Sequence, residues 1–68
     1  MEDYENRMLQ EYNDLTIKID KLYAFTKSEK FKELDKDEKY DLSAQYIAMK
    51  DYEEHLLKRL KRRGLMDD

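Results

Sequence analysis

The chain has 68 residues, of which 40% are hydrophobic and 46% are charged, and its net charge is −3. A chain of this length forms one small domain, residues 1–68, with a thin core. The lack of cysteine excludes disulfides and thiolate zinc sites, and the negative charge argues against general nucleic-acid binding. No run approaches the roughly 18 apolar residues of a membrane span, and the acidic start is unlike a signal peptide. We therefore expect a cytoplasmic protein without a membrane partner.

The residue types favour helix over strand along the whole chain. One glycine and no proline interrupt it, and β-branched residues are few. Apolar residues in the first part recur every three or four positions, which predicts a helix over about residues 2–27. The residues of this stripe are Tyr4, Met8, Tyr12, Leu15, Ile19, Leu22 and Phe25.

A helix start signal follows the first helix. The hydroxyl of Ser28 can cap a short helical turn over about residues 29–34. Phe31 and Leu34 within this turn are the apolar side chains that would close that end of the molecule. The chain is expected to reverse its direction here.

A second start signal begins another long helix. Asp35 can cap it, and Glu38, three residues later, completes the pattern of a capping box. This helix is predicted over about residues 36–63. Gly64 supplies the left-handed residue that commonly ends a helix, and a frayed tail is expected over residues 64–68.

Two long helices joined by a compact turn pack antiparallel, so the sequence predicts an all-α helical hairpin. The second helix has more apolar surface than one partner helix can cover. One of its faces carries Leu42, Tyr46, Met49, Leu56 and Leu60, and a neighbouring face carries Tyr40, Ala44, Ile47 and Ala48. We therefore expect the chain to bind itself and form a homo-oligomeric bundle, either a dimer or a higher symmetric assembly.

The inventory of catalytic residues is short. The single histidine, His55, has Asp51 and Arg59 four residues away on either side, which indicates a solvent-exposed charged row. The di-metal signature of helical bundles needs Glu three residues before His, and Tyr52 occupies that position. One glycine cannot form a phosphate-binding loop. We expect no enzyme, no catalytic residue, no metal site and no cofactor.

The end of the second helix is the most basic part of the chain, with five cations within residues 57–63. The antiparallel hairpin sets this end beside the acidic start of the first helix, at Glu2, Asp3 and Glu5. Pairing between the two ends accounts for these cations without a ligand. The alternative is that some of them face a cleft between copies and bind an anion such as phosphate.

The expected register brings polar residues together near the open end of the hairpin. Tyr4 would lie level with Arg59, and Glu11 level with Tyr52. The four candidate site residues are Arg7, Glu11, Tyr52 and Arg59. Two guanidinium groups, one carboxylate and one aromatic face suit the phosphates, ribose and base of a nucleotide. A salt-bridge cluster with a packed tyrosine uses the same residues.

The order of residues resembles a family of short bacteriophage proteins related to one from a crAss-like phage, over about residues 4–60. The polar matches are Arg7, Glu11, Gln45, Tyr52 and Arg59. Phe commonly stands in that family where this chain has Tyr4. The resemblance implies a phage protein that acts in the host bacterial cytoplasm. Other small helical-hairpin phage proteins assemble into symmetric oligomers that sequester the cyclic nucleotide signals of antiphage defence, and this chain is similar in size and architecture.

The resulting interpretation is a phage anti-defence protein that sequesters a nucleotide immune signal, a cyclic oligonucleotide or an ADP-ribose derivative, at pockets between subunits. Arg7 and Arg59 would grip phosphate, Tyr52 would stack on the base, and Glu11 would contact a ribose.

Two alternatives remain open at this point. The first is a protein–protein inhibitor of a host defence factor, which would use the acidic residues 35–41 and Glu53 and Glu54. The second is a purely structural oligomerisation module whose charges serve solubility. Binding of DNA by the basic end is disfavoured, because only residues 58–68 carry the positive charge and the remaining surface repels phosphate.

Overall fold

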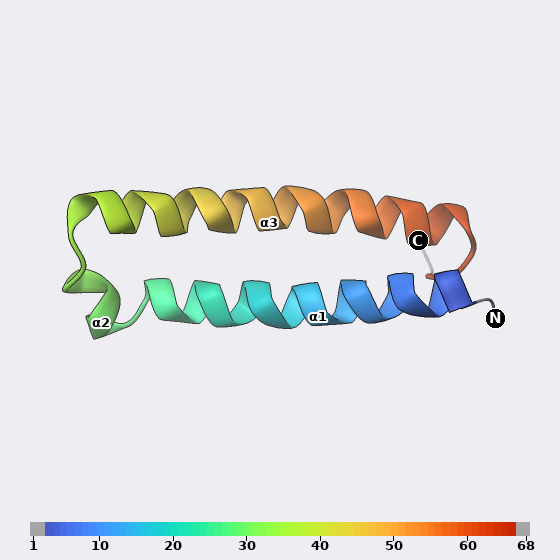
Figure 1. Ribbon diagram of the computed structural model, residues 1–68, viewed down its shortest axis with the longest axis horizontal. Helices are drawn as coiled ribbons and strands as arrows, with labels where there is room; N and C mark the ends of the chain where they lie inside the picture. The colour runs from blue at the N-terminus through green and yellow to red at the C-terminus, as the bar shows by residue number, and fades with distance from the viewer. Residues whose placement is uncertain (1–2, 67–68) are drawn as a thin grey trace.

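The computed structural model describes residues 3–66, nearly all of which are helical. Helix α1 spans Asp3–Thr26, α2 spans Glu29–Lys32 and α3 spans Lys36–Arg62. The two long helices lie side by side and run in opposite directions, and α2 lies at the turn (Figure 1). The molecule measures 46 × 20 × 15 Å. The predicted all-α hairpin is confirmed for a single chain, while assembly of copies into a bundle stays a prediction.

The observed helices end close to the predicted boundaries. The first ends at Thr26 and the last at Arg62, one residue earlier than predicted in each case. The predicted start at residue 2 lies outside the described residues. Between residues 3 and 66, neither long helix carries an apolar stretch of the length that crossing a bilayer would require.

Both predicted caps at the turn are present. The Ser28 hydroxyl accepts a hydrogen bond of 3.3 Å from the backbone N–H of Phe31. An Asp35 carboxylate oxygen accepts one of 2.8 Å from the backbone N–H of Glu38. The first N–H groups of a helix have no partner within the helix, so these side chains explain why α2 and α3 begin where they do. The rings of Phe25 and Phe31 meet edge to face at 6.1 Å, which packs α2 against the end of α1.

The C-terminal end of α3 closes with a glycine in the left-handed region, as predicted. Gly64 has φ 74° and donates its N–H to the carbonyl of Lys61 at 3.0 Å. Leu65 donates its N–H to the carbonyl of Leu60 at 2.9 Å, which completes a Schellman motif. The motif folds Leu65 and Met66 back onto the core. The prediction of a frayed tail is therefore wrong for these two residues, and residues 67–68 lie outside the described part of the chain.

The core is small and lies between the facing stripes of α1 and α3. Its buried side chains are Met8, Leu15 and Ile19 from α1 and Leu56 and Leu60 from α3. Tyr12, Tyr46 and Met49 pack against it as half-buried neighbours. Ile19 is the buried residue nearest the turn, and the apolar residues Leu22, Phe25, Leu42 and Tyr46, which lie closer to the turn, are only half-buried. Most of the buried core therefore joins α1 and α3 toward the open end.

Candidate functional site

A hollow of about 450 Å³ opens on the surface where α1 faces Tyr52 of α3. Its lining combines two cations, two carboxylates, an amide, a leucine and an aromatic ring. These residues are Arg7, Gln10, Glu11, Asp14, Leu15, Lys18 and Tyr52. The buried Leu15 forms the floor, because its side chain belongs to the core, and the other six lining residues are exposed.

The structure brings three of the four predicted site residues to this hollow, namely Arg7, Glu11 and Tyr52. Arg59 is not among its lining residues. Its Nη2 instead donates a hydrogen bond of 2.6 Å to the hydroxyl of Tyr4. This contact confirms the predicted register, in which Tyr4 and Arg59 lie level. It also holds the Arg59 guanidinium near the open end, because Arg59 lies about 10 Å beyond Tyr52 along the helix axis.

Sequence reasoning missed four residues of the hollow, and the signal for two of them was available. Arg7, Glu11, Asp14 and Lys18 recur at spacings of four, three and four, so they form one polar stripe on α1. This stripe runs beside the apolar stripe that identified the helix. Continuing it past Glu11 would have found Asp14 and Lys18. Gln10 joins the stripe through a 3.0 Å hydrogen bond that its amide donates to Asp14.

The two cations of the hollow are free to bind an anion. Arg7 and Lys18 are exposed, and within residues 3–66 the structure records no hydrogen bond or ion pair for either. Their positions lie about 16 Å apart along α1, and their long side chains can reach two anionic groups of one ligand. Tyr52 is 44% exposed, so part of its ring is open to stacking. The Glu11 carboxylate can accept hydrogen bonds from hydroxyl groups.

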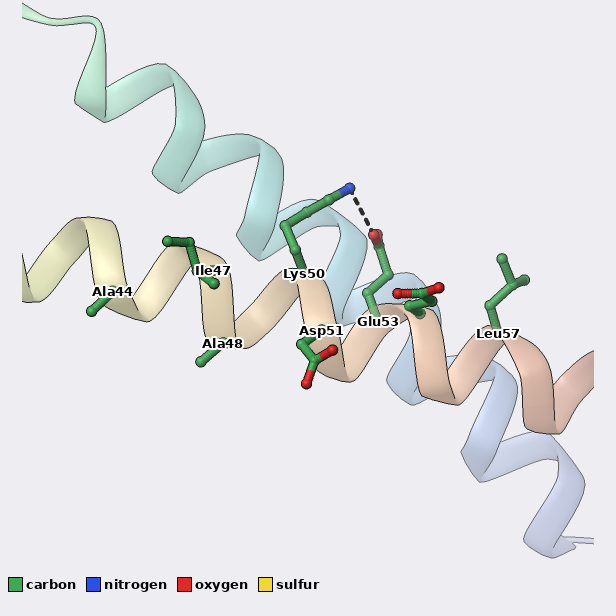
Figure 2. Close-up of a pocket in the computed structure, with 8 residues that line it drawn as sticks. Ala44, Ile47, Ala48, Lys50, Asp51, Glu53 and Leu57 are labelled. Carbon is green, nitrogen blue, oxygen red and sulfur yellow. Dashed lines mark hydrogen bonds and ion pairs between the residues drawn. The ribbon is translucent and has the colours of Figure 1, made fainter.

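A larger groove, of about 640 Å³, lies on α3 alone. Figure 2 shows Ala44, Ala48 and Asp51 projecting from one side of the helix, with Lys50 and Glu53 projecting away from them. The Nζ of Lys50 lies 3.0 Å from a Glu53 carboxylate oxygen, and this hydrogen bond raises the pKa of Lys50 above its ordinary value. The groove thus offers carboxylates and a committed lysine. It suits a phosphate ligand less well than the hollow beside Tyr52.

The basic end of α3 packs against the start of α1. An Arg63 guanidinium nitrogen lies 3.6 Å from a Glu5 carboxylate oxygen, and the guanidinium lies over the Tyr4 ring at 4.8 Å. Pairing between the acidic start and the basic end is therefore confirmed for Glu5 and Arg63. The predicted partner Glu2 lies outside the described residues.

The one histidine lies on the outer surface of α3. His55 is exposed, with its Nε2 3.9 Å from an Asp51 carboxylate oxygen, as the predicted charged row requires. Between residues 3 and 66, no three side chains of the metal-binding types are grouped closely enough to hold an ion. The polar hollow is therefore the candidate site of this protein.

Comparisons with known protein sequences identify relatives of this chain. The sequence profile of the Sequestin family matches residues 2–62. A protein of Enterobacteria phage T4, described as an uncharacterized 7.5 kDa protein in the denB-rIIB intergenic region, is 40% identical over 57 residues, which cover 84% of this chain and 89% of that protein. No solved structure matches the chain. The predicted kinship with short phage proteins is confirmed, and the chain belongs to the Sequestin family of small phage proteins.

Proposed function

We propose that this protein sequesters a nucleotide immune signal, a cyclic oligonucleotide or an ADP-ribose derivative, in the cytoplasm of an infected bacterium. The family name denotes sequestering, which supports a binding role rather than a catalytic one. The observation that carries the proposal is the hollow in which two unengaged cations, Arg7 and Lys18, flank the exposed ring of Tyr52.

Four of the lining residues have roles that follow from their chemistry. The Arg7 guanidinium presents a planar fork of donors that matches two phosphate oxygens, and Lys18 supplies a second positive charge. The Tyr52 ring stacks on a nucleobase, and Glu11 accepts hydrogen bonds from ribose hydroxyls. In this proposal Lys18 has the phosphate-binding role that the sequence analysis gave to Arg59, because the Arg59 guanidinium donates a hydrogen bond to Tyr4.

The hollow is open to solvent, and small-molecule sites bury most of their ligand. We infer that a second copy of the chain covers the exposed side of the nucleotide, so that the complete pocket lies between subunits. Sequestration then needs no chemical step. The host signal is withdrawn by mass action when binding is tight and the protein is in excess over the signal.

Isothermal titration of the intact protein with a panel of cyclic dinucleotides, cyclic trinucleotides and ADP-ribose derivatives tests the proposal. We expect one chemical class to bind, and the bound nucleotide to be recovered unchanged when the complex is heated and analysed by chromatography. Recovery of a cleaved nucleotide would contradict binding without catalysis. No binding of any panel member by the folded protein would contradict the nucleotide signal.

A matched pair of substitutions locates the site. Arg7→Gln is expected to weaken binding by about tenfold or more, because it removes a charge-assisted contact to phosphate. Lys30→Gln removes the same charge from an exposed residue of α2 and is expected to leave affinity unchanged. Tyr52→Leu should weaken binding with an unchanged salt dependence, because stacking is lost without a change in charge. Equal affinity of the wild type, Arg7→Gln and Tyr52→Leu would exclude this hollow as the site.

A further inference from the structure

A second surface of the molecule has a regular pattern that the proposed site does not use. Eight exposed residues on the outer face of α3 recur at alternating spacings of four and three, which places them in one row along the helix. They are Asp37, Asp41, Ala44, Ala48, Asp51, His55, Lys58 and Arg62. This spacing is the heptad pattern that lets two helices remain in contact over their length.

The charges of this row change sign from one end to the other. The row begins with the acids Asp37 and Asp41 and ends with the bases Lys58 and Arg62. The positions between them include two alanines, whose small side chains allow another helix to approach closely. Figure 2 shows Ala44 and Ala48 projecting from the same side of α3 as Asp51.

We propose that this row is the contact between two copies of the chain, which pack α3 against α3 in antiparallel orientation about a two-fold axis that passes between positions 49 and 50. Asp37 then faces Arg62 of the partner subunit, and Asp41 faces the partner's Lys58. Ala44 faces the partner's His55. The symmetry repeats each contact, so the interface contains four pairs of opposite charge.

The charge pattern decides the orientation and the occupant. In a parallel pairing each residue of the row would face its own copy, so Asp41 would meet Asp41 and Lys58 would meet Lys58. In the antiparallel pairing acids meet bases at both ends. The row is therefore complementary to a second copy of itself. A partner with a single sign of charge would be attracted to one end of the row and repelled by the other.

Contacts within α3 do not prevent this pairing. Lys58 lies 3.6 Å from Glu54, and both side chains are more than half exposed. Exposed ion pairs of this kind contribute little to stability, and they exchange readily for pairs across an interface. Asp37, Asp41 and Arg62 have no ion pair recorded within residues 3–66.

The same geometry covers exposed apolar surface beside the row. Ile47, which is 67% exposed in the single chain, borders the row on the side opposite Tyr52, so the partner helix covers part of it. The interface does not depend on a ligand.

Cysteine cross-linking tests the orientation in a chain that has no cysteine of its own. The double variant Ala44→Cys, His55→Cys is expected to form a disulfide-linked dimer under mild oxidation. Each single variant should stay unlinked, because its two thiols would lie about 16 Å apart along the helices. Linked dimers from the single variants would indicate parallel packing and would overturn the proposal, as would the absence of any linked product.

Charge exchange tests the same contact without cysteine. The wild type is expected to be a dimer in analytical ultracentrifugation, and Asp41→Lys should raise its dissociation constant by about tenfold or more, because the like-charge contact occurs twice. Lys58→Asp alone should do the same, and combining both substitutions should restore dimerisation. Glu33→Lys, at an exposed position in the turn, is the control and should have no effect.

The outcomes separate this interface from the proposed function. A monomer at all concentrations, or a dimer unaffected by Asp41→Lys, overturns the interface. A charge-sensitive dimer that binds no nucleotide in the titration panel supports the interface and removes the proposed function.

Discussion

The turn end and the open end of the hairpin are held by different kinds of interaction. At the turn, Ser28 and Asp35 each cap a backbone N–H only three residues away. At the open end the contacts join residues far apart in sequence. Arg59 donates to the hydroxyl of Tyr4 across 55 positions, and the buried Leu56 and Leu60 belong to the core shared by both long helices.

This difference follows from chain connectivity. The helix ends at the turn are close in sequence, so little conformational entropy is lost in bringing them together. The open end has no such advantage, and buried apolar area with long-range polar contacts must hold it. The Schellman motif at Gly64 strengthens this end, because it returns Leu65 to the core. The comparison predicts that removing a buried side chain at the open end destabilises the hairpin more than removing a half-buried side chain or a cap near the turn.

The largest effect is expected from the core. Leu56→Ala removes a side chain that is 0% exposed and should lower the free energy of unfolding by about 2–5 kcal/mol. Leu42→Ala, at a half-buried position nearer the turn, should cost about 1–2 kcal/mol. Urea unfolding followed by circular dichroism, at one fixed protein concentration, measures both. Equal losses would contradict the difference between the two ends.

The next effect tests the local interactions at the turn. Asp35→Ala removes the acceptor for the N–H of Glu38 and should lower the free energy of unfolding by about 1 kcal/mol. Asp35→Asn keeps an acceptor oxygen and is the matched control, with most of the stability retained. The same urea titration measures both variants. A loss as large as that of Leu56→Ala would show that the turn matters as much as the core.

A smaller effect isolates one long-range polar contact at the open end. Tyr4→Phe deletes the hydroxyl that accepts from Arg59 but keeps the ring beneath Arg63, and should cost about 0.5–1 kcal/mol. Tyr4→Leu loses the aromatic face as well and should cost more. Thermal unfolding of the three proteins side by side gives the order. If Tyr4→Phe is as stable as the wild type, the hydrogen bond from Arg59 contributes no more to stability than the hydrogen bond to water that replaces it on unfolding.

The smallest effect concerns the Lys50–Glu53 pair in the middle of α3. The hydrogen bond to Glu53 raises the pKa of Lys50 above its ordinary 10.5, so the pair favours the folded state below pH 10.5, and this contribution is lost as pH rises through the folded pKa. Glu53→Gln should return the pKa of Lys50 toward 10.5, which nitrogen-detected NMR can follow. Stability at neutral pH should change little, because the Lys50 side chain is half exposed and solvent screens the pair.

Helix positions and helix ends could be predicted because they depend on residues near each other in the chain. The caps at Ser28 and Asp35 and the left-handed Gly64 are local patterns, and the structure contains all three. The packing of the two residues after Gly64 could not be predicted in the same way. Leu65 and Met66 were expected in a frayed segment, yet they pack on the core because the turn at Gly64 directs them there.

The candidate site was predictable in part for the same reason. Arg7 and Glu11 share the polar stripe of one helix, and the register of the hairpin brings Tyr52 beside them. Arg59 was placed with them from its level along the hairpin alone. The position of a residue along the hairpin does not determine which side of the helix its side chain reaches. In the structure the Arg59 guanidinium donates a hydrogen bond to the hydroxyl of Tyr4.

The sequence alone determined that this protein is a helical hairpin, because periodicity, capping residues and a single glycine act within a few positions of one another. The tertiary structure decided which of its many charged side chains are engaged and which are free. That outcome depends on the angular position of each residue around two packed helices, and spacing along the chain does not reveal it until the register and the facing sides are known.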